Sequence, residues 1–142
     1  MDKDCIFCKI LSGELESHML YRDEKCAAFL DIQPVNPGHT LIVPIEHHAY
    51  VSDIPDDIVS HMFVVGKKIT QNLYKSNLKC EGVNFFLADG EAAMQEVFHS
   101  HLHVFPRFKG DGFGLKHSPE YFTKPSWESL GQVAKLIHDA GV

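Results

Sequence analysis

The stretch that decides the interpretation of this chain is Gln95-Glu-Val-Phe-His99-Ser-His101-Leu-His103-Val-Phe-Pro-Arg107. Alternate side chains of a β-strand project from the same face. A strand here would therefore place three imidazoles in a row, roughly 6–7 Å apart from Cα to Cα, with the intervening apolar side chains directed into a core. Three imidazoles are costly to bury without a function, so we interpret this row as the working site.

The chemistry of a histidine row favours reactions at phosphorus. A neutral imidazole is a nucleophile near pH 7 and also a general acid or base, and neighbouring donors can neutralise phosphate oxygens. The chain has neither a phosphate-cradling G-x-x-x-x-G-K-[ST] loop nor a G-x-G-x-x-G fingerprint. Phosphate would then be held by the histidines, by backbone N–H groups and by the polar stretch from Asp89 to Gln95. A metal site is the competing interpretation, because imidazoles on one strand can ligate zinc.

Length and composition indicate one soluble globular domain over residues 1–142, with a C-terminal tail and helix over about 115–142. The chain has 142 residues, is 44% hydrophobic and 23% charged, and carries a net charge of −6 with histidine neutral. This charge argues against binding to nucleic acid or to an anionic membrane surface. No apolar run is long enough to span a membrane and no signal peptide is recognised, so we expect a cytoplasmic protein.

Only the Cys5-Ile-Phe-Cys8 pair has informative cysteine spacing. A C-x-x-C pair can be half a zinc site, a redox pair or a coincidence. The redox interpretation is disfavoured because no strand precedes the pair. A zinc site needs two further ligands, for which the ten histidines are candidates. Cys26 and Cys80 are expected to be small buried hydrophobic residues.

The spacing of apolar residues along the sequence, together with the turn-forming residues between the apolar runs, predicts an α+β fold. We expect a five-stranded mostly antiparallel sheet with helices on one side. The helices are one long helix, a short N-terminal helix and a C-terminal helix; His61, in the long helix, is expected at its surface or boundary. Ser52 or Asp53 can cap the long helix. The apolar face of the C-terminal helix is predicted to point inward through Trp127, Leu130, Val133 and Ile137. The predicted strands are 18–22, 26–32, 39–44, 82–87 and 97–105, and the predicted helices are 7–11, 53–76 and 126–140.

The histidine stretch matches a known family pattern, His-x-His-x-His-x-x, in which each x is apolar and Ser100 is the one exception. On this basis the chain resembles the histidine triad (HIT) family, over roughly residues 5–117, and most closely its small bacterial-type members with an N-terminal C-x-x-C. Further matching segments are Cys5–Ile10, Ala28–Ile32, Pro37-Gly38-His39, Pro44, Asp89-Gly90 with Gln95, Pro106-Arg107 and Gly110–Gly114.

The resemblance implies a HIT-like fold and a nucleotide hydrolase or nucleotidyl transferase that acts at the α-phosphorus of nucleoside phosphate derivatives, of phosphoramidate type. In that family the middle histidine attacks and forms a covalent nucleotidyl-histidine intermediate. Here His101 would be the nucleophile, His103 would contact phosphate and protonate the leaving group, and His99 and His39 would orient the cluster. Asp31 would bind the ribose hydroxyls. The base of a purine nucleotide such as an AMP derivative would lie against Ile6, Phe7, Phe29 and Ile32.

The resemblance also supplies a zinc site. Some family members with this N-terminus hold a structural zinc, and the corresponding ligands here are Cys5, Cys8, His47 and His99. Such a closed Cys2His2 set leaves no position for water, which suits structural zinc, so no cofactor is required for catalysis. The family also implies a homodimer that pairs its sheets edge to edge.

Two departures from the family pattern bear on substrate choice. Ala88 stands where many members have Asn or Gln, and Glu96 stands where many have Ser or Thr. Glu96 near a phosphate is electrostatically unfavourable, so we expect it to turn aside or to pair with a cation. The alternative functions are a dinucleoside-polyphosphate hydrolase of the same family and a nucleotide-binding scaffold protein with weak turnover.

Overall fold

The computed structural model describes residues 2–141, and the chain divides after Asp111 into two compact units. The first unit contains one five-stranded sheet in the order β1-β2-β3-β5-β4, in which every neighbouring pair is antiparallel. This confirms the predicted α+β architecture. The strands are β1 Met19–Arg22, β2 Cys26–Leu30, β3 Thr40–Pro44, β4 Gly82–Phe86 and β5 Leu102–Arg107.

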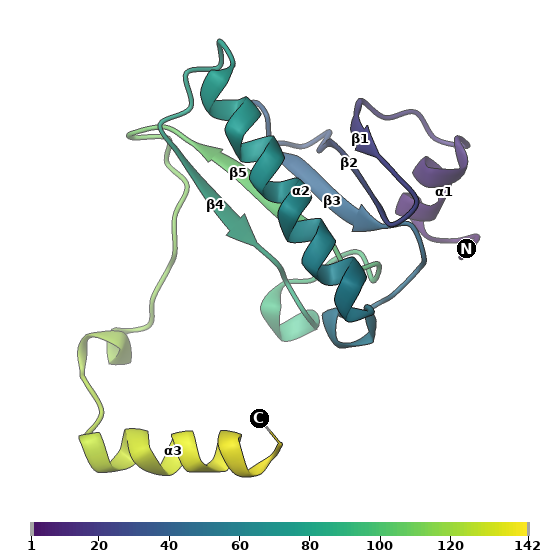
Figure 1. Cartoon of the computed structure of the whole chain (residues 1–142). Helices are drawn as coiled ribbons and strands as arrows, with labels where there is room; N and C mark the ends of the chain where they lie inside the picture. Colours follow the sequence, from purple (N-terminus) through teal and green to yellow (C-terminus); the bar gives the residue numbers. More distant parts are fainter. Residues whose placement is uncertain (1, 142) are drawn as a thin grey trace. The chain divides into compact units, whose positions relative to one another are not determined.

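The long helix α2, Asp56–Lys75, lies across one face of the sheet (Figure 1). It begins later than predicted because Pro55 occupies the N-cap position and the chain before it forms a 3-10 turn, Val51–Asp53. Neither Ser52 nor Asp53 caps the helix, since no side chain bonds the N-terminus of α2. Proline suits the start of a helix because its missing N–H would have no partner there.

The core between α2 and the sheet is apolar and fully buried. The predicted inward side chains Leu102 and Val104 of β5 belong to it. Gly66 of α2 allows close packing, because a Cβ there would lie 3.1 Å from the Phe85 ring and 3.5 Å from Ile42. The remaining core residues are Cys26, Ala28, Ile42, Ile54, Met62, Val65, Ile69 and Leu73.

The short helix α1, Ile6–Ser12, covers the opposite face, so the prediction that all helices lie on one side is wrong. Alternate residues of β2 and β3 point to opposite faces, and those facing α1 form a second core of Cys5, Phe7, Cys8, Leu11, Ala27, Phe29, Leu41 and Val43. Apolar residues occur on both faces of β3, whose residues are all buried. The spacing of apolar residues in the sequence does not determine which helix covers which face of the sheet.

The histidine stretch is only partly a strand. β5 begins at Leu102, so His103 lies in the sheet, whereas His99 and His101 precede it. The strand also continues through Pro106 to Arg107, beyond its predicted end. The backbone N–H of Ser100 donates to the carbonyl of His48 at 2.7 Å instead of joining a ladder. The three imidazoles are therefore held by different local structures and are not equivalent.

His61 ties α2 to the β1–β2 turn. Its Nε2 lies 2.6 Å from a carboxylate oxygen of Asp23, and Tyr21 donates its hydroxyl to the same oxygen at 2.7 Å. The other oxygen of Asp23 accepts the backbone N–H groups of Lys25 and Cys26. The half-buried His61 thus lies at the boundary of the helix, as predicted.

The second unit contains a 3-10 turn, Pro119–Phe122, and helix α3, Trp127–Asp139. The hydroxyl of Ser126 caps α3 by accepting the N–H of Ser129. No residue of α3 is buried and Trp127 is 88% exposed, so the second unit by itself does not cover the apolar face of the helix, and the prediction that this face points inward stays a prediction. An amphipathic stripe identifies an apolar face without identifying what covers it.

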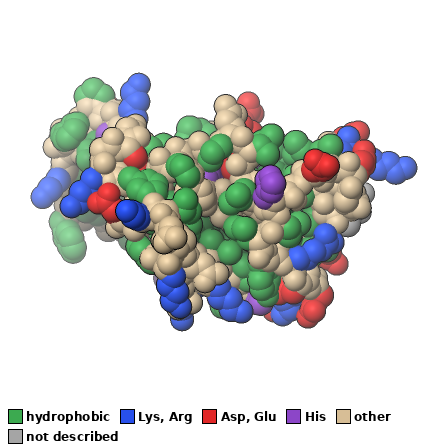
Figure 2. Space-filling model, turned by 90° about the horizontal axis from the view of Figure 1, so that it is seen from above, with side chains coloured by type: hydrophobic (Ala, Val, Ile, Leu, Met, Phe, Trp, Pro, Cys, Tyr) green, Lys and Arg blue, Asp and Glu red, His purple; other side chains and the backbone are tan. Residues whose placement is uncertain are grey.

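The face drawn in Figure 2 shows acidic and basic side chains interspersed with apolar ones. This mixed pattern agrees with the modest net charge of −6. Within residues 2–141, no helix has the length and apolar character needed to cross a membrane.

Candidate active site and metal centre

A cavity of about 700 Å³ opens on the face of the sheet that faces away from α2. Its floor includes His103, which β-pairing places between Leu41 of β3 and Phe86 of β4. The full lining is Ile6, Phe7, Ile10, Leu15, Glu16, Phe29, Leu30, Asp31, Ile32, Gln33, Val35, His39, Leu41, Phe86, Met94, Glu96, Val97, His101, His103 and Phe105. The volume and the apolar walls with a few convergent polar groups are typical of a small-molecule site.

Hydrogen bonding determines the tautomer of His101. Its Nδ1 lies 2.8 Å from the carbonyl oxygen of His99, which can only accept, so Nδ1 carries the proton and donates it. The other ring nitrogen, Nε2, therefore has a free lone pair. The ring is buried and packs edge-on against Phe7, with centroids 5.0 Å apart. A fixed, neutral imidazole with one unprotonated nitrogen is a nucleophile.

A second chain of bonds determines the tautomer of His103. The backbone N–H of Val35 donates to Nδ1 of His39 at 3.1 Å, so the proton of neutral His39 is on Nε2. That Nε2 lies 2.9 Å from Nδ1 of His103, which must accept. Neutral His103 therefore carries its own proton on Nε2. The neighbouring imidazoles thus differ in role, because His101 presents a lone pair and His103 presents a donor.

Burial keeps all four imidazoles neutral near pH 7. Desolvation lowers the pKa of His99 to about 4 and that of His103 to about 3, and it lowers the pKa of His39 and His101 as well. The backbone bond from His101 to His99 and the charges of Asp31 and Glu96 act in the opposite direction on His101. Neutrality preserves the tautomers described above.

Asp31 lines the cavity and comes just after β2. One carboxylate oxygen accepts the N–H of Gln33 at 2.8 Å, and the other lies 3.7 Å from Nε2 of His39. Phe29 lies near it and packs edge-on against Phe7, with centroids 5.7 Å apart. The predicted residues Ile6, Phe7, Phe29, Asp31, Ile32 and His39 all line this one cavity.

Asp89 and Gln95 lie outside the cavity lining. The Asp89 carboxylate accepts the N–H of Val51 at 2.7 Å. The buried Gln95 amide accepts the N–H of Gly90 and donates to the carbonyls of Ala49 and Val97. The structure therefore gives both side chains a loop-bracing role, and their contact with substrate stays a prediction.

Sequence reasoning missed Met94. Met94 and the exposed Glu96 both line the cavity, and within residues 2–141 no ion pair involves Glu96. The expectation that Glu96 turns aside from a bound phosphate stays a prediction. Met94 has a left-handed backbone conformation with φ of 68° and is 72% exposed. No periodicity indicated either position, because both lie in the irregular segment that precedes β5.

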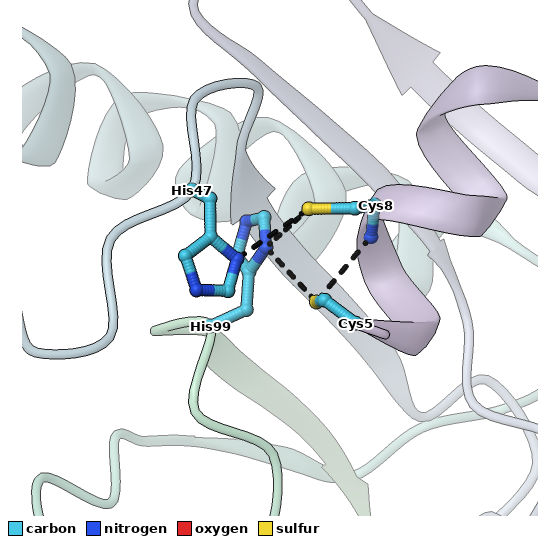
Figure 3. A group of neighbouring side chains, drawn as sticks. All are labelled: Cys5, Cys8, His47 and His99. Atoms are coloured by element: carbon cyan, nitrogen blue, oxygen red, sulfur yellow. Dashed lines mark hydrogen bonds between the residues drawn. The ribbon is translucent and has the colours of Figure 1, made fainter. Parts of the chain in front are cut away.

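Four predicted metal ligands converge beside the cavity (Figure 3). Nδ1 of His99 lies 3.5 Å from Sγ of Cys5 and 3.6 Å from Sγ of Cys8, and Nδ1 of His47 lies 3.4 Å from Sγ of Cys8. One ligand atom from each residue lies within 4.8 Å of every other. α1 contributes the cysteines at its first turn, while the histidines follow β3 and precede β5.

The chemistry of this set fits a structural zinc. Nε2 of His99 donates to the carbonyl of Pro44 at 2.8 Å, which leaves Nδ1 unprotonated and aimed at the thiols. Cys5 and Cys8 are free and buried, and burial raises the pKa of the Cys5 thiol, whose proton a metal would displace. Two sulfurs and two nitrogens are a typical tetrahedral zinc set.

Two other groups are less suited to a metal. Asp31, His39 and His103 lie close together, but the facing nitrogens of the two histidines bond each other. Asp23 and His61, which lie near Cys26, are likewise bonded to each other. Neither group offers three free ligand atoms.

Comparison with known proteins identifies related sequences. A model of the HIT domain matches residues 12–110. An uncharacterized HIT-like protein of Borreliella burgdorferi is 47% identical over 114 residues, covering 80% of this chain and 82% of the relative. An adenosine 5′-monophosphoramidase of Candida albicans is 42% identical over 114 residues, covering 78% of this chain and 74% of the relative.

Solved structures share the whole fold. A HIT family protein of Bacillus anthracis superimposes with a TM-score of 0.89 at 35% identity, over 100% of both chains. A histidine triad nucleotide-binding protein of Candida albicans gives 0.84 at 35% identity, over 96% of both chains. A zinc-bound histidine triad family protein of Mycobacterium smegmatis gives 0.75 at 36% identity, over 96% of this chain and 97% of that one.

Proposed function

The chain belongs to the histidine triad (HIT) family, and from this premise we propose that it hydrolyses nucleoside phosphoramidates at the α-phosphorus through a covalent nucleotidyl-His101 intermediate. The observation that carries the proposal is the bond from Nδ1 of His101 to the carbonyl of His99, which frees Nε2 inside the cavity. The similarity to an adenosine 5′-monophosphoramidase supports the substrate class.

The proposed first step is attack of Nε2 of His101 on phosphorus. A bond forms between that nitrogen and phosphorus, the P–N bond to the amine breaks, and its electron pair stays on the departing nitrogen. The Nε2–H of His103 hydrogen-bonds that nitrogen, an arrangement that the His39–His103 bond supports, and a solvent water supplies the proton that the departing amine takes up. A second water then attacks the phosphorus, the electron pair returns to His101, and the proton that this water loses returns to solvent.

The nucleoside is proposed to bind at the Asp31 end. The Asp31 oxygen that does not bond Gln33 is available to accept the ribose hydroxyls. Ile6, which is 43% exposed, and Ile32, which is 89% exposed, can cover a purine ring. Burial of these apolar groups against a base would contribute about 25 cal/mol per Å² covered.

A structural zinc is proposed at Cys5, Cys8, His47 and His99, supported by the converging ligand atoms and by the zinc-bound relative of known structure. The metal would fasten α1 to the segment before β5. All four positions are protein ligands, so the ion would leave catalysis to the imidazoles.

A homodimer is proposed along β4, an edge strand with unpaired backbone groups. Phe85 of β4 is 40% exposed and lies near Phe63 of α2, which is 45% exposed, with ring centroids 5.9 Å apart. Light scattering of Phe85→Glu should give a monomer mass. The control Leu20→Glu, on the opposite edge strand, should stay dimeric, and a monomeric wild type would reject the proposal.

The function is tested with His101→Ala and an adenosine phosphoramidate. The variant should lose hydrolysis by at least about 10³-fold, remain folded by circular dichroism, and still bind AMP by calorimetry. His18→Ala, an exposed histidine outside the cavity, is the matched control and should keep full activity. Binding of AMP by a wild type that turns over no phosphoramidate would instead indicate a nucleotide-binding protein.

A further inference from the structure

The cavity wall has an unusual charge for a phosphate site. Three carboxylates line it, those of Glu16, Asp31 and Glu96, whereas no lysine or arginine is among the described residues that form the lining. One phosphate can be neutralised by imidazole and backbone donors. A leaving group that is itself a phosphate would add negative charge beside uncompensated carboxylates, which Coulomb repulsion disfavours.

Glu96 lies in the segment that leads to the nucleophile His101, and both residues line the same cavity. Asp31 follows β2 beside the apolar wall, while Glu96 belongs to the segment between the 3-10 turn Glu91–Ala93 and β5. Asp31 is assigned to the ribose, and Glu16 follows α1, whose Ile6 is assigned to the base. Of the three carboxylates, Glu96 is therefore left to face the group that departs from phosphorus.

Met94 adds an apolar surface beside this charge. It lines the cavity, is 72% exposed, and is one of two described non-glycine residues with positive φ. A left-handed backbone is unfavourable for methionine, so the loop holds it there against a conformational cost. A flexible thioether side chain adapts to an aliphatic chain in its vicinity.

We propose that Met94 and Glu96 form a leaving-group subsite that selects phosphoramidates of amines whose alkyl chain ends in a positive charge. Met94 contacts the chain and Glu96 contacts the terminal cation. Glu96 exchanges no proton and forms no covalent bond, so the chemical steps at His101 and His103 stay as described. The assignment of this subsite rests on the proposed function.

The experiment compares three adenosine phosphoramidates of equal chain length whose alkyl amine ends in an ammonium, a methyl or a carboxylate group. A charge about 4 Å from Glu96 in a water-like dielectric changes binding by about fivefold. We expect kcat/KM to fall about fivefold from ammonium to methyl and again from methyl to carboxylate. High salt should reduce these differences in kcat/KM among the three substrates.

Variants assign the ranking to Glu96. Glu96→Gln should remove most of the difference between ammonium and carboxylate substrates, Glu96→Lys should reverse it, and Glu96→Asp should largely retain it. Glu91→Gln, an exposed acid in the same loop but outside the cavity lining, should leave the ranking unchanged. Equal rates for the three wild-type substrates, or a uniform loss in Glu96→Gln, would overturn the proposal.

Binding without turnover separates this subsite from the catalytic mechanism. Dissociation constants of the same three compounds are measured on His101→Ala and on His101→Ala combined with Glu96→Gln. A charge ranking that appears in the first protein and disappears in the second supports the subsite even if the wild type hydrolyses none of the compounds. Equal binding of all three to both proteins rejects the subsite even if hydrolysis through His101 is established.

Discussion

Removal of one cysteine from the proposed zinc site should cost the protein several kcal/mol. Cys8 belongs to α1, and the sulfur atoms of Cys5 and Cys8 meet the imidazole of His99 across a sequence separation of 94 and 91 residues, respectively. A cross-link that closes a loop of this length stabilises a fold by about 4–5 kcal/mol in the chain-entropy account. Cys8→Ser should therefore lose zinc and much of this stabilisation.

The assay combines metal analysis with thermal unfolding of protein purified without a histidine tag. Wild type should contain one zinc per chain, and a chelator should lower its Tm by about 15 °C, since 1 kcal/mol is about 4 °C for a domain of this size. Cys8→Ser should contain little zinc and should already unfold near the chelated wild-type temperature.

Cys80→Ser is the matched control, because Cys80 lies outside the ligand cluster and its thiol donates to the carbonyl of Gly82. It should keep its zinc and the full response to the chelator. Wild type with less than about half an equivalent of zinc, or a Tm that the chelator moves by less than about 2 °C, would refute the reasoning.

Two further predictions concern stability. In the folded chain the pKa of His99 is about 4 and that of His103 is about 3, so below about pH 6.5 the unfolded chain binds protons that the folded chain does not. Urea titrations in the presence of a chelator should therefore show the free energy of unfolding falling by about 1–2 kcal/mol per histidine from pH 6.5 to pH 5. A free energy of unfolding that does not change with pH would contradict the burial of neutral imidazoles. Gly38→Ala should destabilise by about 1–3 kcal/mol in the same assay, because φ is +94° and a Cβ would lie 3.0 Å from Leu73 and from Leu78. Gly13→Ala, which has φ of +82° with nothing within 4 Å, should cost less, and equal losses would rule out the steric part.

The parts of the fold that follow from local pattern were predictable from sequence. Apolar runs bounded by turn residues identified the buried strands, and the three- and four-residue apolar spacing identified α2. The predicted start of α2 was too early, because Pro55, and not Ser52 or Asp53, occupies the N-cap position of the helix. The relative placement of elements was less accessible, since α1 covers the face opposite α2 through contacts with residues far away in sequence.

In the candidate site, too, local sequence patterns predicted some features, whereas others depend on tertiary structure. The His-x-His-x-His spacing and the C-x-x-C pair led to residues that the structure brings together, although His99 and His101 precede β5 instead of lying in it. Asp89 and Gln95 are predicted from sequence to contact the substrate, and in the structure their side chains accept backbone N–H groups, Asp89 that of Val51 and Gln95 that of Gly90. Whether a polar side chain bonds a neighbouring backbone group or faces a cavity depends on tertiary structure, which their spacing does not encode.

The central claim is a covalent bond between His101 and the nucleotide. The most direct measurement is mass spectrometry of wild-type protein mixed rapidly with an adenosine phosphoramidate and quenched in alkali, where phosphorus–nitrogen bonds persist. The account predicts a mass increase of one adenylyl group, mapped by peptide fragmentation to His101 and missing in His101→Ala. An adduct on another residue, or a His101→Ala variant with near-full activity, would contradict it.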